Sequence, residues 1–214
     1  MAEKCYKCFR PKKSCYCKYI VPVTTSVKFV FLMHPKEAFK QKTGTGRLAS
    51  LTLPGSEIII GVDFTQNKRV NEILTDSQYF PVLMYPDENA WTADRPGLKN
   101  AIGNKTLLVF LVDATWFFAK KMLRLSTNLF TIPKLSFAKG YISQYKFKTQ
   151  PAKECLSTIE TCYYLLNELQ ENEIILPTNT ESLMDIFHRL VNYQLESEKL
   201  RQESGQPSRY SKSS

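Results

Sequence analysis

The 214-residue sequence has no apolar run that approaches the length of a membrane helix. About 18 consecutive apolar residues are needed to cross a bilayer. The opening "MAEKCYKCFRPKKSCYC" also lacks the apolar segment of a secretory signal peptide. We therefore expect a cytoplasmic protein without a membrane partner. The hydrophobic fraction of 43% supports a folded core, and the length suits one domain with short additional segments at its ends.

Several common catalytic and nucleotide-binding signatures are also missing. The stretch "TGTGR" at 43–47 matches neither the Walker A loop nor the dinucleotide fingerprint. Its glycines either let the backbone approach a ligand, with Arg47 pairing with phosphate, or belong to an ordinary surface loop. Only two histidines occur, and no serine–histidine–aspartate constellation stands out. We interpret His34, which precedes a proline, as a loop residue whose ring acts as a hydrogen-bonding spacer. His188 is interpreted as solvent-facing.

Acidic residues are almost absent from the first fifty positions, which hold eleven lysines and arginines against two glutamates. The other 164 residues carry 18 basic and 18 acidic side chains, so the net charge of +9 belongs to the N-terminal quarter. A localised basic region favours contact with a polyanion, above all nucleic acid. A basic arm that only aids solubility is the alternative.

Four of the six cysteines lie within thirteen residues, in the pattern C-x2-C-x6-C-x-C. Cys5, Cys8, Cys15 and Cys17 can surround one tetrahedral zinc ion, and four sulfur ligands leave no open position for a substrate. Disulfides are the rival interpretation, but the chain does not resemble a small secreted domain. We therefore predict a structural zinc knuckle over residues 1–22. Cys155 and Cys162 are interpreted as ordinary residues, with Cys162 on the apolar face of a helix.

Apolar and amphipathic segments alternate through the rest of the chain. Strands are predicted at 26–33, 56–64, 81–90, 106–112 and, more briefly, 129–133, and helices at 48–54, 67–76, 114–126, 156–170 and 181–202. This alternation predicts an α/β fold with a mostly parallel sheet and flanking helices over 23–200. Ser157 and Glu160 form a capping-box signature. Residues 34–48 are predicted to be a loop, and 201–214 a disordered tail.

Three unusual loops follow predicted strands, at 34–47, 85–90 and 113–116, and in parallel sheets ligands bind at the carboxyl ends of strands. Asp113 has two possible roles there. It could cap the next helix by accepting from the backbone N–H of Thr115 or Trp116. Alternatively, it could act as a partly desolvated proton acceptor. The helical period places Trp116 with Ala119, Met122 and Leu123 on the buried face of that helix, although an exposed Trp116 could stack on a base.

Six motifs in order resemble those of the DTW-domain family, the tRNA-uridine aminocarboxypropyltransferases. They are "CYKCFRPKKSCYC", "HPKEAFKQKTGTGRL", "PVLMYP", "DATWFFAKKM", "LFTIPK" and "LSTIE", and they span about residues 5 to 160. The signature itself is Asp113-Ala114-Thr115-Trp116. Gly44, Thr127 and Lys134 depart from the residues most frequent in the family.

The resemblance implies a fold related to the SPOUT methyltransferases, with a knotted C-terminal half. It also implies transfer of the 3-amino-3-carboxypropyl group of S-adenosylmethionine to N3 of an unpaired tRNA uridine, with release of 5′-methylthioadenosine. Asp113 would accept the N3 proton, within a catalytic group completed by Thr115 and Trp116. An RNA methyltransferase and a non-catalytic zinc-containing RNA-binding module remain alternatives. The tRNA position, and the choice between monomer and homodimer, stay open.

The resemblance further assigns binding residues. Donor contacts are expected from the strand ends and from the start of a later helix: Leu83, Tyr85, Pro86, Leu111, Leu156, Ser157 and Thr158. Contacts to tRNA phosphates are expected from the knuckle and its surroundings: Lys12, Lys13, Lys42, Arg47 and Lys120.

Overall fold

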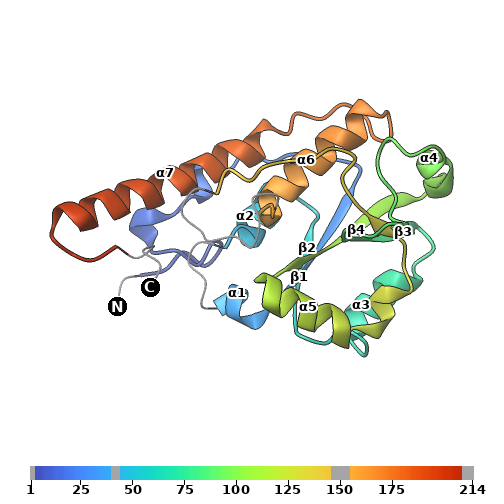
Figure 1. Cartoon of the computed structure of the whole chain (residues 1–214), viewed down its shortest axis with the longest axis horizontal. Helices are drawn as coiled ribbons and strands as arrows, with labels where there is room; N and C mark the ends of the chain where they lie inside the picture. The colour runs from blue at the N-terminus through green and yellow to red at the C-terminus, as the bar shows by residue number, and fades with distance from the viewer. Residues whose placement is uncertain (1–2, 40–43, 146–154, 209–214) are drawn as a thin grey trace.

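A five-stranded parallel sheet forms the centre of the computed structural model, which describes residues 3–39, 44–145 and 155–208 (Figure 1). The strand order is β2-β1-β4-β3-β5, and every neighbouring pair is parallel. The strands are β1 (Lys28–Met33), β2 (Glu57–Ile60), β3 (Tyr79–Met84), β4 (Thr106–Asp113) and β5 (Lys134–Leu135). The predicted α/β class with a parallel sheet is confirmed.

Helices cover both faces of the sheet. One layer consists of α2 (Gly46–Thr52), α6 (Thr158–Glu171) and α7 (Glu181–Glu203), and the other of α3 (Lys68–Thr75) and α5 (Trp116–Leu125). The shorter elements are α1 (Pro35–Phe39), α4 (Leu98–Ile102), and the 3-10 turns η1 (Lys12–Ser14), η2 (Cys17–Tyr19) and η3 (Thr127–Phe130). The N-terminal knuckle, which contains η1 and η2, lies against α7 (Figure 1).

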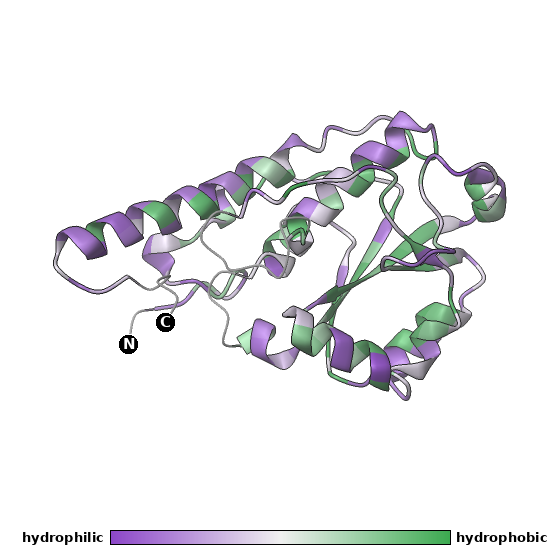
Figure 2. Cartoon of the chain, viewed as in Figure 1, coloured by the Kyte–Doolittle hydropathy of each residue, from purple (hydrophilic) through white to green (hydrophobic). Residues whose placement is uncertain are grey.

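The central strand β4 shows why its sequence is apolar almost throughout. Leu107, Val109 and Leu111 pack into the core with α2, α6 and α7, whereas Leu108 and Phe110 pack with α3 and α5. Successive side chains of a strand point to opposite faces, and a sheet covered on both faces requires apolar residues on each. Figure 2 shows mostly hydrophobic strands at the centre and, around them, helices in which hydrophilic and hydrophobic residues alternate. By the same alternation, the side chain of Asp113 points toward the layer of α2 and α6.

Local signals account for several helix ends. The side chain of Asn67 accepts a hydrogen bond from the Val70 N–H (3.0 Å) and caps α3. The capping box predicted from Ser157 and Glu160 is present at the start of α6. Helix α7 continues to Glu203, a little beyond the predicted end of the catalytic domain at residue 200. Residues 209–214 of the predicted tail lie outside the described residues.

The structures predicted for two segments were wrong. The region 34–48, expected to be a loop, contains α1 and the start of α2. Pro35 opens α1, a position where its missing N–H leaves no hydrogen bond unmade. The strand expected at 129–133 is the turn η3 followed by the shorter β5, and pairing there begins at the Pro133 carbonyl, which accepts from the Leu83 N–H (2.9 Å).

The buried position that the helical period predicted for Trp116 was also wrong, because this residue is 40% exposed, as the alternative of a base-stacking role requires. Met122 and Leu123 are buried as expected. His188 is exposed and Cys162 is fully buried, both as predicted. The knotted path implied by the resemblance stays a prediction. Within the described part of the chain, every helix is too short or too polar to cross a bilayer.

Candidate active site and metal centre

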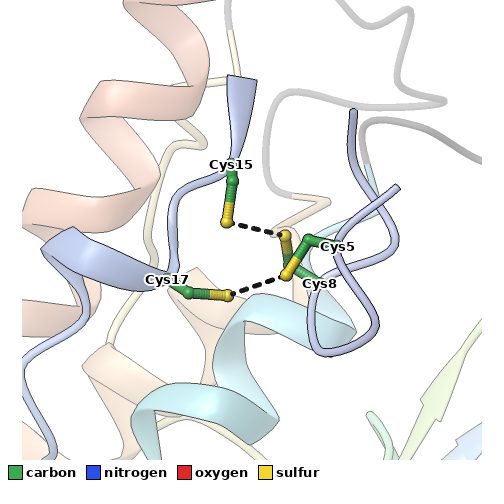
Figure 3. Close-up of side chains that lie close together, drawn as sticks. All are labelled: Cys5, Cys8, Cys15 and Cys17. Atoms are coloured by element: carbon green, nitrogen blue, oxygen red, sulfur yellow. Dashed lines mark hydrogen bonds between the residues drawn. The ribbon is translucent and has the colours of Figure 1, made fainter. Parts of the chain in front are cut away.

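The four N-terminal cysteines converge on one point (Figure 3). Their sulfur atoms all lie within 4.8 Å of one another. The Cys5 and Cys17 sulfurs are 3.7 Å apart, as are those of Cys8 and Cys15. All four are free thiols rather than disulfides. The knuckle therefore gathers the predicted ligands without cross-linking them.

This geometry fits a zinc ion. A zinc–sulfur distance of about 2.3 Å in a tetrahedral site places the ligand sulfurs about 3.8 Å from one another. Backbone hydrogen bonds at Cys8 and Lys7 lower the pKa of the Cys5 thiol to about 6, so one ligand is readily deprotonated. Burial raises the pKa of Cys17, and a divalent cation would overcome that effect by stabilising the thiolate. Such a site is structural, because its four ligands fill the coordination sphere.

Replacing Cys5 by serine is expected to abolish stoichiometric zinc binding and to loosen the knuckle. The knuckle packs on α7 through Tyr16 and Tyr193, whose ring centroids are 6.2 Å apart. A decrease of about 3 kcal/mol in the free energy of unfolding would lower Tm by roughly 6–12 °C for a domain of this size. Metal analysis and calorimetry on Cys5→Ser measure both effects, with Cys155→Ser as the matched control outside the cluster. Unchanged zinc content in Cys5→Ser would show that the cluster is not the metal site.

A pocket of about 650 Å³ opens at the carboxyl ends of β3 and β4. Its walls come from the ends of those strands, from the starts of α5 and α6, and from the segment that follows β5. The lining is mostly apolar, with a few hydroxyls and the carboxylates of Glu37 and Asp113. An apolar cleft of this size with a small number of polar groups is typical of a small-molecule site.

Asp113 is the last residue of β4 and is only 6% exposed. Its backbone is held in the sheet, where its carbonyl accepts from the His34 N–H (3.0 Å). Its side chain points between α2 and α6, where the Thr158 hydroxyl donates to Oδ1 at 2.6 Å. Gly46 faces the same carboxylate so closely that an added Cβ would lie 2.3 Å from Oδ2. The carboxylate is therefore fixed from both sides while it still lines the pocket.

The capping role predicted for Asp113 was wrong, because the N-cap of α5 is Thr115. The alternation of β4 explains the difference. Asp113 shares its face with Leu111 and Val109 and so points away from the layer that contains α5. The helix that meets the Asp113 side chain is instead α6, through Thr158.

A family model for the DTW domain matches residues 2–195. The chain belongs to the DTW-domain family. Among its relatives is a Drosophila melanogaster protein named tRNA-uridine aminocarboxypropyltransferase 2, which is 30% identical over 201 residues, covering 91% of this chain and 76% of the relative. Proteins of the same name from Mus musculus and Macaca fascicularis are each 27% identical over 197 residues, covering 90% of this chain and 64% of theirs. No solved structure matches the chain.

Most of the residues predicted for catalysis and donor binding in this DTW domain gather around the pocket. The signature residues Asp113, Thr115 and Trp116 line it. So do six of the expected donor contacts: Tyr85, Pro86, Leu111, Leu156, Ser157 and Thr158. Leu83 does not, because it points into the core beneath α3 and α5, and its neighbour Met84 lines the pocket in its place.

The basic residues predicted to contact RNA are more scattered. Arg47 is half-buried, with its guanidinium 4.2 Å above the ring of Phe9 in the knuckle. Burial lowers the pKa of Arg47, and the nearby negative charge of Asp113 opposes that shift, so Arg47 links the knuckle to the site. Lys12, paired with Glu3 at 2.5 Å, is exposed on the knuckle, as is Lys13, and Lys120 is exposed on α5. Lys42 lies outside the described residues.

Sequence reasoning missed the pocket wall between β5 and α6, where Ser136, Phe137 and Tyr145 line the cavity. Two fully buried glutamates of α6 hold this segment in place. Glu168 accepts from the backbone N–H groups of Ala138 (2.9 Å) and Lys139 (3.0 Å). Glu160, already visible in the capping box, also accepts from the Gln144 N–H at 2.7 Å.

Glu37 and Gly46 were missed as well. Glu37 lies in the short helix α1, which the sequence did not predict. Gly46 belongs to the "TGTGR" stretch, for which close approach of the backbone to a ligand was one of the two interpretations. In the structure the group that approaches this glycine is the Asp113 carboxylate.

Proposed function

We propose that this chain is a tRNA-modifying transferase that moves the 3-amino-3-carboxypropyl group of S-adenosylmethionine to N3 of a tRNA uridine. The main observation in support is the Asp113 carboxylate, which is buried, restrained from two sides and part of the wall of an apolar pocket. The chain's relatives in the DTW-domain family carry the name of that activity.

The pocket residues fit the proposed donor. The apolar side chains of Met84, Leu111 and Leu156 offer contacts for an adenine ring, and the hydroxyls of Ser157 and Ser136 offer hydrogen bonds. The carboxylates of Asp113 and Glu37 suit the positive charges of a sulfonium and an ammonium group. When bound, S-adenosylmethionine supplies an electrophilic carbon beside its sulfonium, with 5′-methylthioadenosine as the leaving group.

Asp113 would act as the proton acceptor. Uridine N3 carries a proton and is a weak nucleophile until that proton leaves. The Asp113 carboxylate takes this proton as the bond from N3 to the donor carbon forms, and the electrons of the broken carbon–sulfur bond remain on sulfur. Thr158 orients the carboxylate by its hydrogen bond, and the apolar walls exclude water. The rest of the catalysis is alignment of the attacking nitrogen, the carbon and the sulfur.

The tRNA must present an unpaired uridine, because N3 lies on the edge of the base that pairs in a duplex. The basic N-terminal quarter supplies phosphate contacts, with the exposed Lys12 and Lys13 on the knuckle and Arg47 between the knuckle and the site. Binding should therefore weaken steeply as salt increases, since each phosphate contact releases counterions.

Incubation of the purified chain with S-adenosylmethionine and unmodified tRNA tests the proposal. We expect the modified uridine, detected by mass spectrometry of nucleosides, together with an equal amount of 5′-methylthioadenosine. S-adenosylhomocysteine as the by-product would indicate a methyltransferase instead. Binding of tRNA without any product from either chemistry would indicate a non-catalytic RNA-binding module. Mapping the modified nucleoside within the tRNA would identify the target position.

A further inference from the structure

Aromatic side chains are exposed at one side of the pocket mouth. Phe117 and Trp116, in the first turn of α5, both line the pocket, and they are 75% and 40% exposed. Large apolar rings that remain exposed beside a site commonly mark a surface that another molecule covers. A molecule that inserts one group into the pocket can therefore also contact the exposed ring of Phe117.

Phe117 rests on a rigid support. Its ring meets Phe118 edge to face, with centroids 5.4 Å apart. Phe118 in turn stacks on His34 at a centroid distance of 4.3 Å, and His34 is buried, with Nδ1 accepting from the Lys36 N–H at 3.1 Å. This row joins α5 to the start of α1. Ring contacts of this kind fix the orientation of an exposed aromatic surface.

Lysines surround the same row. The Lys36 ammonium lies 4.4 Å above the ring of Phe118. Lys121 follows Phe118 by three residues and Phe117 by four in α5, so it lies on the same side of the helix as both rings. Burial lowers the pKa of His34, and the positive charges of Lys36 and Lys121 lower it further. Both lysine side chains are exposed. The surface therefore combines exposed rings with positive charge directly outside the pocket.

We propose that this surface, formed by Phe117, Phe118, Lys36 and Lys121, is a stacking platform for the nucleotide next to the target uridine. Exposed rings interleaved with lysines suit single-stranded nucleic acid, because a base stacks on the ring while the lysines contact the flanking phosphates. An apolar protein surface would cover the rings but leave the lysines without a negative counterpart. The inference rests on the proposed function and names the part of the tRNA that this side of the site holds.

The direct test is Phe117→Ala, with Phe117→Trp as the variant that preserves stacking. Loss of one base–aromatic stack is expected to raise the Kd and KM for tRNA by about 5- to 150-fold, while the KM for S-adenosylmethionine stays unchanged. Phe117→Trp should remain within about threefold of the wild type. Phe130→Ala is the matched control, since Phe130 is 51% exposed and lies away from the pocket lining.

A second arm tests the lysines. The double variant Lys36→Gln/Lys121→Gln should reduce the slope of log Kd against log salt by about 1.4, because each contact to a single-stranded phosphate contributes about 0.7. Lys68→Gln/Lys99→Gln, with exposed lysines on α3 and α4, should leave that slope unchanged.

Three outcomes would overturn the platform. One is an unchanged tRNA affinity in Phe117→Ala. Another is a raised KM for S-adenosylmethionine, which would assign Phe117 to donor binding. The third is conversion of a dimer to a monomer in sedimentation velocity, which would make this surface a contact between two copies. Equilibrium tRNA binding tests the platform even if the wild type forms no product, so its failure is distinguishable from failure of the proposed function.

Discussion

Replacement of Asp113 by asparagine is expected to lower the rate of uridine modification by on the order of 10²–10⁴. Asparagine has nearly the same shape and can still accept the hydrogen bond from the Thr158 hydroxyl, but it cannot take the N3 proton. Single-turnover measurement of product formation, at saturating donor and tRNA, isolates this step. Binding of tRNA and the Tm should stay close to the wild-type values.

Asp76→Asn is the matched control, because Asp76 lies before β3, at the opposite end of the strand from the pocket. Its replacement should leave the modification rate within about twofold, as expected for a surface change. If Asp113→Asn retained a third or more of the wild-type rate, the proton acceptor would have to be another group, and the role assigned to Asp113 would be wrong.

Replacement of Gly46 by alanine is expected to lower the rate of uridine modification by about 10²-fold without changing the chemical identity of any reacting group. The new Cβ would lie 2.3 Å from Oδ2 and 2.5 Å from Cγ of Asp113. The carboxylate has little room to retreat, because its other oxygen is held by Thr158 and its backbone by the sheet. A displacement of about 1 Å at a catalytic group can lower a rate about 10²-fold. The rate constant kcat and circular-dichroism melting are the measurements.

Gly140→Ala provides the control for Gly46→Ala. An added Cβ at Gly140 would meet no atom within 4 Å, so its kcat should match the wild type. The melting curve of Gly46→Ala shows whether a rate loss reflects unfolding. A folded Gly46→Ala protein with full activity would mean that α2 moves aside easily and that its close approach to Asp113 has no catalytic role.

Local patterns predicted most of the framework because they depend on neighbouring residues. The apolar run of β4 and the helical periods of α6 and α7 were recognisable from the spacing of apolar side chains. The four cysteines were recognisable for the same reason, since all the ligands lie within one short segment. The short helix α1 was missed because a proline beside a histidine was interpreted as part of a loop.

The decisive contacts of the site could not be predicted in this way. Thr158 and Asp113 are 45 residues apart in the chain, and nothing in either neighbourhood indicates the other. Asp113 and Thr115 are both favourable capping residues, so composition alone could not choose between them. The strand's alternation makes that choice once the two helix layers are known, and those layers depend on long-range packing.

The restraint of Asp113 from two distant segments also sets when the site can form during synthesis. Strand β1 must pair with β4 before the Asp113 backbone is held in the sheet. The Asp113 side chain is restrained only after Thr158 has left the ribosome. Pairing between strands far apart in the chain is slow, because the intervening segment must close first. In a nascent chain that ends before α6, the Asp113 side chain therefore lacks the restraint from Thr158, which arises only when α6 docks on the sheet.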